Sequence, residues 1–196
     1  MGSIGWTKVN ENTDSKDLNK LWKNLKLEKV NEWTQPANIL INKMNDIFCN
    51  GGIEIRKYKI IETETNFDCL MLDKHLAQNI YCNNDILDDR KYLNFDGKLP
   101  EIKILDHFTD IYTLSGNLAK IMANGGAYGR IEPKYAWKIA TEFVENEFEN
   151  RFDDFNYYVV EIINSSWFHN IAWDYSLIIT DRKKYDIIFI DITDTD

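Results

Sequence analysis

The strongest constraint on the fold of this 196-residue chain lies in its last part, where apolar residues alternate with other residues in two consecutive runs. In IAWDYSLIIT, the odd-numbered residues from Ile171 to Ile179 share one face, and Asp174 and Ser176 fall on the other. YDIIFIDIT alternates in the same way, and the DRKK sequence between the two runs is a turn signal. A period of two residues is typical of β-strands. Residues 171–192 are therefore predicted to form a β-hairpin.

The rest of the chain supplies a third strand for this hairpin and several helices. NYYVVEII, residues 156–163, is rich in β-branched and aromatic residues and predicts a strand. Apolar residues recur at helical spacing in four segments. These segments are residues 14–33, 35–52, 113–124 and 132–152. IEIRKYKII, residues 53–61, predicts a strand at a sheet edge, whereas residues 62–108 give no clear pattern. The prediction is a single α+β domain, 1–196, with N-terminal and central helices packed on a C-terminal antiparallel sheet.

The composition of the chain indicates the cellular compartment of the protein. Hydrophobic residues make up 44% of the chain and charged residues 28%, which is ordinary for a globular protein. No apolar run is long enough for a transmembrane helix, and the first residues do not resemble a signal peptide. The chain has three cysteines, Cys49, Cys69 and Cys82, and no two of them form a CxxC motif. This odd number and wide spacing indicate reduced thiols. These features predict a cytoplasmic protein that has no membrane partner.

The net charge of −9 is unevenly distributed along the sequence. Residues 1–140 contain equal numbers of basic and acidic residues, whereas residues 141–196 contain 4 Lys+Arg and 13 Asp+Glu. A negative field of this kind repels nucleic acid and attracts cations or basic proteins. The sequence therefore predicts no nucleic-acid partner.

Motifs for catalysis or cofactor binding are weak. The three histidines lie far apart, without the spacing of a zinc site. GGAYGR follows a helical pattern and lacks the GK[ST] of a phosphate loop, so it is interpreted as a helix stop and turn. DITDTD lacks the spacing of an EF-hand loop. We assign no catalytic residue, metal or cofactor. A small hydrolase that uses Asp174, Asp191 and Asp194, with a divalent metal, remains an alternative, as does a subunit of a larger assembly.

Three segments, GGAYGR, WFHNIAWDYSLIITD and ITDTD, resemble those of small cytosolic bacterial immunity proteins that act against polymorphic or contact-dependent toxins. The resemblance covers the chain from Gly125 onward and lies in its pattern of aromatic and Asp residues. It implies a non-catalytic protein that binds one cognate toxin domain and blocks its active site.

A basic toxin, for example a nuclease, would be attracted by the acidic end of this sequence. Aromatic side chains are the usual anchors of protein interfaces. Trp167 and Phe168, in the loop NSSWFHN, are expected to be exposed, whereas Trp173 is expected in the core. The predicted partner-binding residues are Tyr128, Trp167, Phe168, His169, Asp174, Asp181, Asp191 and Asp194. The oligomeric state is left open.

Overall fold

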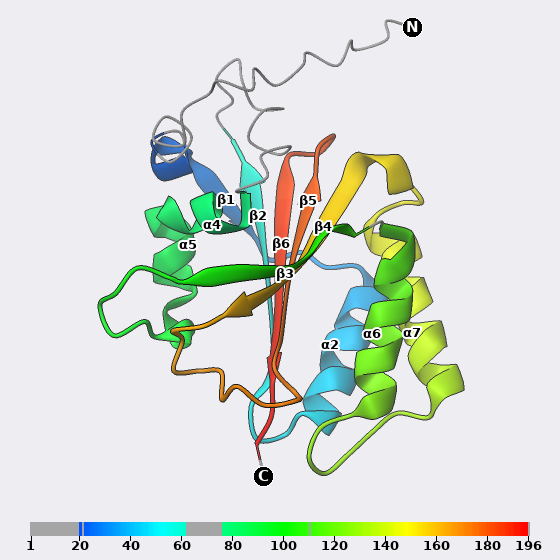
Figure 1. The fold of residues 1–196 in the computed structure, drawn as a ribbon. Helices are drawn as coiled ribbons and strands as arrows, with labels where there is room; N and C mark the ends of the chain where they lie inside the picture. Colours follow the sequence, from blue (N-terminus) through cyan, green and yellow to red (C-terminus); the bar gives the residue numbers. More distant parts are fainter. Residues whose placement is uncertain (1–19, 21, 62–75, 110, 196) are drawn as a thin grey trace, which may run out of the picture.

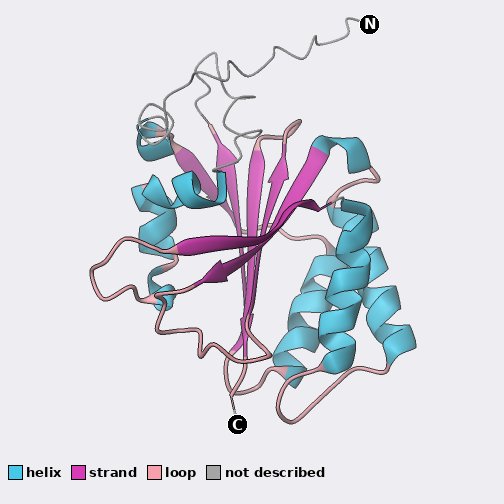
Figure 2. Ribbon diagram, in the orientation of Figure 1, coloured by secondary structure: helices cyan, strands magenta, loops and turns pink. Residues whose placement is uncertain are grey.

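A six-stranded antiparallel sheet runs through the centre of the molecule (Figures 1 and 2). The computed structural model describes residues 20, 22–61, 76–109 and 111–195. The strands are β1 (Leu27–Val30), β2 (Gly52–Ile60), β3 (Ile102–Thr109), β4 (Phe155–Ile162), β5 (Tyr175–Asp181) and β6 (Asp186–Thr193). Their order in the sheet is β1-β2-β6-β5-β4-β3, so β6 joins a pair of early strands to the three others.

The predicted hairpin is confirmed as β5 and β6, with the register Asp181 opposite Asp186. Its stripe of alternate isoleucines on β6 faces the larger core, as the alternation predicts. The first strand begins later than expected, because residues 171–174 form a turn and a short connection instead of extended backbone. The predicted third strand, 156–163, is β4 and differs from the prediction by one residue at each end.

Two predictions for the N-terminal part are wrong. The strand expected at a sheet edge is β2, which lies between β1 and β6. The helix expected over 14–33 is present at residues 20 and 22–24, but it does not extend through Leu27–Val30, because these residues pair with Lys57–Ile60 as strand β1. Pairing with a neighbouring strand has overridden local helix propensity here. The start of that predicted helix, 14–19, lies outside the described residues.

Helices cover both faces of the sheet, which confirms the α+β class (Figure 1). One face carries α2 (Gln35–Ile47), α6 (Leu114–Asn124) and α7 (Pro133–Glu147), which correspond to three predicted helices. The other face carries the short helices α4 (Leu76–Asn79) and α5 (Asn84–Asp89) with the 3-10 turns Ile80–Cys82 and Lys91–Leu93. Two further 3-10 turns, Ile111–Thr113 and Phe152–Asp154, precede α6 and β4.

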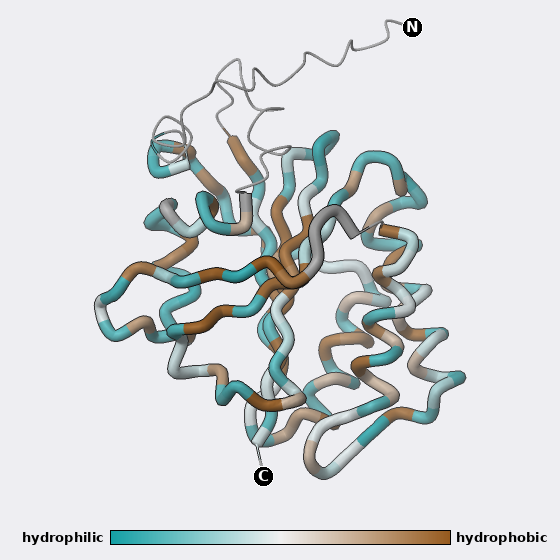
Figure 3. The backbone as a smooth tube through the Cα atoms, viewed as in Figure 1, coloured by the Kyte–Doolittle hydropathy of each residue, from teal (hydrophilic) through white to brown (hydrophobic). Residues whose placement is uncertain are grey.

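The helix sequences explain where these elements begin and which faces they bury. The Thr34 hydroxyl accepts a hydrogen bond from Ala37 N at the start of α2, and Pro36 occupies the first turn, where it loses no helical bond. In α7 the buried residues Ala136, Ala140 and Phe143 recur at helical spacing against the sheet. Hydrophobic stretches follow the strands, and hydrophilic ones mark the outer turns (Figure 3).

The sheet divides at one end of β4. Pairing between β4 and β5 ends at Val160 and Ser176, whereas pairing between β4 and β3 continues to Ile162. Beyond Val160, β4 turns away from β5 together with β3 (Figure 1). The connection between the two strands, residues 163–174, closes the resulting gap and forms the candidate site.

Candidate binding pocket between β4 and β5

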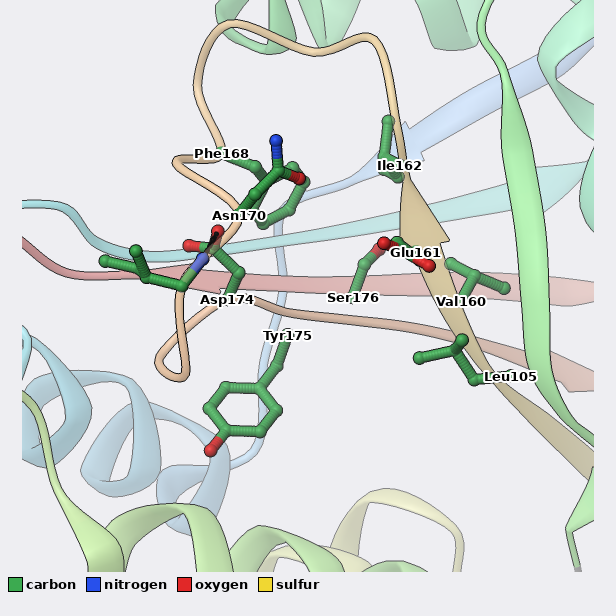
Figure 4. Close-up of a pocket in the computed structure, with 10 residues that line it drawn as sticks. Leu105, Val160, Glu161, Ile162, Phe168, Asn170, Asp174, Tyr175 and Ser176 are labelled. Carbon is green, nitrogen blue, oxygen red and sulfur yellow. Dashed lines mark hydrogen bonds between the residues drawn. The ribbon is translucent and has the colours of Figure 1, made fainter.

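A pocket of about 280 Å³ occupies the gap between β4 and β5 (Figure 4). β4 contributes one wall, the 163–174 loop contributes the opposite wall, and the first residues of β5 lie between them. The lining residues are Leu105, Val160, Glu161, Ile162, Phe168, Asn170, Ile171, Asp174, Tyr175 and Ser176. The pocket therefore combines an apolar wall with a few polar groups, which is typical of binding sites.

The 163–174 loop is held in place by contacts with the segment after α5. The Ser165 hydroxyl donates a hydrogen bond of 2.5 Å to the Leu93 carbonyl, and the Ser166 amide donates to the Asn94 carbonyl at 3.1 Å. The Trp167 ring packs edge-on against Tyr92, with 5.2 Å between ring centroids. These contacts fix the wall of the pocket before any ligand binds, so little conformational entropy would be lost there on binding.

Asp174 shapes the last turn of this loop. Its Oδ2 accepts hydrogen bonds from the amides of His169 (2.9 Å) and Ile171 (3.0 Å), and its Oδ1 accepts one from the Thr193 hydroxyl (2.6 Å). Local bonds of this kind compete with a strand ladder, which explains why β5 starts only at Tyr175. All three donors are neutral. Among the side chains that the structure describes, which exclude that of His107 on β3, no Lys, Arg or His forms an ion pair with Asp174.

The mouth of the pocket is partly apolar and partly acidic. Leu105 and Ile171 are 54% and 38% exposed, although both are large aliphatic side chains. Glu161 forms an ion pair with Lys103 at 3.3 Å, and both side chains are well exposed. A pair of this kind contributes about 0–1 kcal/mol and is easily exchanged for another partner. Glu161 is therefore available to a cationic ligand.

Two β5 residues connect the pocket to its surroundings. Burial raises the pKa of the Tyr175 hydroxyl. A hydrogen bond with Asn124 lowers this pKa in part, and the charge of Asp174 raises it. Tyr175 is thus a neutral phenol at physiological pH. The Ser176 hydroxyl donates a 2.6 Å hydrogen bond to Asp191 on β6, which links the pocket to a buried ionic cluster.

This cluster lies on the sheet face that carries α4 and α5. Arg90 is 1% exposed and donates from Nη2 to Asp191 Oδ2 at 2.5 Å and from Nη1 to the Tyr81 hydroxyl at 2.6 Å. The Tyr92 hydroxyl also donates to Asp191, and the guanidinium lies 4.0 Å from the Phe189 ring centroid. Burial disfavours the charged form of Arg90, but Asp191, Tyr81 and Tyr92 together outweigh this effect, and the pKa of Arg90 is raised above its usual value. Burial also raises the pKa of Tyr81, to about 12.

The structure brings together some of the predicted partner-binding residues. Phe168 and Asp174 line the pocket, and Trp167 and His169 belong to the same loop. His169 is exposed and Trp167 is partly buried. Phe168 was expected on the surface but is only 8% exposed, because its ring packs in the smaller core and edge-on against Trp167. Trp173 packs against the larger core, as expected.

Three predicted surface carboxylates are buried, so they do not form the acidic surface that the sequence indicated. Asp191 belongs to the Arg90 cluster. Asp181 is 3% exposed and binds both terminal nitrogens of Arg151, at 3.1 and 2.6 Å, at the other end of β5. Asp194 accepts hydrogen bonds from the amides of Asn50 and Ala127. In each case a buried carboxylate satisfies groups of the fold itself.

Tyr128 is 69% exposed, in the glycine-rich turn that Asp194 holds. Gly126 in this turn has no room for a side chain, because an added Cβ would lie 2.2 Å from Asp194 Oδ2. GGAYGR is therefore a turn after α6, as its sequence predicts. Tyr128 does not line the pocket described above.

The carboxylates of the alternative hydrolase have separate roles. Asp174 holds the loop, Asp191 pairs with Arg90 and Asp194 holds the Tyr128 turn. In the part of the chain that the structure describes, no three His, Cys, Asp or Glu side chains form a group that could hold a metal ion. His75 lies outside that part.

Several residues of the pocket could not be recognised in the sequence. Leu105 lies in the segment that gave no clear pattern, and Glu161 occupies an ordinary position in an apolar strand. The sequence shows one thing about Glu161: the alternation in NYYVVEII places it on the face opposite Val160 and Ile162. The gap between β4 and β5, which makes these residues neighbours, has no sequence signal.

Over residues 20, 22–61, 76–109 and 111–195, no helix has both the length and the apolar character needed to cross a bilayer. The chain matched no protein-family model, and comparison with curated proteins gave no significant match.

Proposed function

We propose that this chain is a non-catalytic binding protein of the immunity type, which neutralises a basic toxin domain by covering its active site. The observation that carries this proposal is the pocket between β4 and β5, in which exposed aliphatic side chains lie beside the carboxylates of Glu161 on β4 and Asp174 on the 163–174 loop. Exposed apolar residues beside a pocket are typical of protein interfaces.

The surface around the pocket supports a protein partner. Leu99, Leu105, Ile163 and Ile171 are exposed by 81%, 54%, 40% and 38%. Leu99 and Ile163 are brought together where the Asn164 side chain donates to the Leu99 carbonyl and Ile163 N donates to Glu101. Isolated apolar residues are common on surfaces, but two at the pocket, Leu105 and Ile171, and two more just before β3 and just after β4, Leu99 and Ile163, favour an interaction site.

Electrostatics support a basic partner, although less strongly than the sequence indicated. Five acidic residues of the last part of the chain are buried in the fold: Glu147, Asp181, Asp186, Asp191 and Asp194. Seven others among the described residues are at least partly exposed: Glu142, Glu145, Glu149, Asp153, Asp154, Glu161 and Asp174. The net charge of −9 and these exposed carboxylates would speed the encounter with a cationic protein.

The proposal is tested first by identifying a partner. The tagged full-length chain is incubated with lysate of its native organism, and proteins retained at low and at high salt are identified by mass spectrometry. A stoichiometric basic protein whose association slows as salt rises is expected. That protein is then expressed alone in a heterologous host, where it should arrest growth, and together with this chain, which should restore growth.

Matched variants connect the rescue to the pocket. Leu105→Lys with Ile171→Lys places positive charge at the mouth and should abolish rescue. Tyr135→Lys changes an exposed aromatic residue of α7, 64% exposed and away from the pocket, and should leave rescue intact. As a control, the thermal unfolding midpoint of each variant is first shown to equal that of the wild type. A partner that does not arrest growth, or rescue that survives the double substitution, would contradict the proposal.

A further inference from the structure

The size of the pocket limits what it can hold. At about 280 Å³ it lies just below the range of about 300–1,000 Å³ that is usual for small-molecule and cofactor sites. Its mouth is bordered by exposed Leu105 and Ile171 instead of being closed over. Such a pocket suits one long side chain that enters from a protein surface.

The charge of the pocket indicates the kind of side chain. Glu161 and Asp174 are the acidic residues of the lining, and none of the described lining residues is basic. A carboxylate offers about four lone-pair positions. Asp174 uses both positions of Oδ2 for backbone amides and one of Oδ1 for the Thr193 hydroxyl. One acceptor position therefore remains, on a group that forms no ion pair with a described side chain.

The walls favour a guanidinium over an ammonium group. Val160, Ile162 and Phe168 are the buried apolar residues of the same lining. An arginine side chain is more weakly hydrated than lysine, stacks on aromatic rings and donates hydrogen bonds in several directions. Its methylene stem could lie along the aliphatic wall while the charged end meets the carboxylates.

We propose that this pocket receives an arginine side chain of the basic partner, held by Asp174 and Glu161 against the wall formed by β4 and Phe168. The identity of the partner rests on the function proposed above, whereas the selectivity of the pocket for arginine does not. The two ideas can therefore fail separately.

The test uses the isotope-labelled full-length chain and two small probes. N-acetyl-arginine amide carries the charge, and N-acetyl-citrulline amide has nearly the same shape without it. Amide chemical shifts are followed in NMR spectra as each probe is added at millimolar concentration. The arginine probe should shift the amides of Glu161, Ile171 and Ser176, with weaker binding at higher salt, and the citrulline probe should not.

Variants provide a matched control. Glu161→Gln removes one carboxylate at the mouth and should weaken binding of the arginine probe about threefold. Glu145→Gln makes the same change at an exposed position of α7 that does not line the pocket, and should have no effect. Asp174→Asn keeps an acceptor for the loop amides and should abolish the preference for arginine over citrulline. If Asp174→Asn does not fold, Glu161→Gln alone decides.

Equal shifts with both probes, no shifts, or shifts confined to other acidic surfaces would overturn the inference. Growth rescue that needs Leu105 and Ile171 would then still support the proposed function. Selective arginine binding in a chain that rescues no toxin would support the inference and overturn the function.

Discussion

The guanidinium of Arg90 and the carboxylate of Asp191 meet at 2.5 Å although they lie 101 residues apart in the sequence, and neither is exposed by more than 1%. Tyr81, Tyr92 and Ser176 form further hydrogen bonds with the pair. The pair joins the segment after α5 to the central strand β6 and lies directly behind Ser176 of the pocket. The pocket floor therefore depends on an ion pair that no ligand would touch.

Breaking this pair should be costly. Asp191→Asn leaves the buried guanidinium without a counter-charge, and we expect the free energy of unfolding to fall by about 3–5 kcal/mol. Urea denaturation followed by circular dichroism measures the change. Glu161→Gln, which breaks an exposed pair, should change it by less than about 1 kcal/mol. If both variants lose the same small amount of free energy of unfolding, the buried pair is not needed for stability.

Loss of the Asp174 carboxylate should loosen one loop in particular. Asp174→Ala leaves two backbone amides and the Thr193 hydroxyl without their acceptor, so a loss of about 1–3 kcal/mol is expected. Hydrogen exchange should show faster exchange at His169 and Ile171 and unchanged exchange in α7. Slow exchange at these two amides in the variant would mean that other acceptors hold the loop.

Two glycines should respond to alanine in opposite directions. At Gly126 a Cβ would lie 2.2 Å from Asp194 Oδ2 and 2.6 Å from the Ile47 carbonyl oxygen, so Gly126→Ala should destabilise the protein by about 1–3 kcal/mol. At Gly116, inside α6, the nearest atom is a ring carbon of Trp137 at 3.9 Å, and Gly116→Ala should stabilise it by about 0.5–1 kcal/mol. Thermal unfolding of both variants measures the difference, and the reverse order would contradict it.

Asp186 should make stability depend on pH. Burial, opposed in part by the charge of Lys57, raises the pKa of this carboxyl above its usual value of 3.8. The folded state therefore holds the proton more strongly than the unfolded state, and Asp186 lowers the free energy of unfolding as pH rises through this range. Asp186→Asn should be more stable than the wild type at pH 7, and the difference should vanish as pH falls below 3.8. A variant that is less stable at pH 7 would show that attraction to Lys57 outweighs burial.

The sequence predicts elements whose pattern is local and misses those that exist through distant contacts. The period of two residues in Leu177 to Ile179 and in Ile188 to Ile192 is enough to place β5 and β6 and their buried face. Strand β1 is only four residues long and is extended because it pairs with β2. The start of β5 was missed because Asp174 binds the amides of its own loop, which an alternating pattern does not reveal.

The candidate site shows the same limit. The loop with Phe168 and Asp174 could be singled out by residue type, but the gap beside β4 that makes it a pocket could not. The acidic end of the sequence also looked like an acidic surface. In the fold, Lys57 and Arg90 from the first part of the chain neutralise Glu147 and Asp191 from the last part. Charge that is segregated along the chain is thus partly mixed in space.

The central position of β6 has a consequence during synthesis. β1 and β2 form one part of the sheet, and β3, β4 and β5 form another. β6 lies between the two parts and pairs with β2 on one side and β5 on the other. Every other strand leaves the ribosome before β6 does. Until then the edges of β2 and β5 lack their native neighbour, and edges of this kind are prone to pair with other chains. A nascent chain stalled before β6 would therefore need a chaperone more than any later form of the protein.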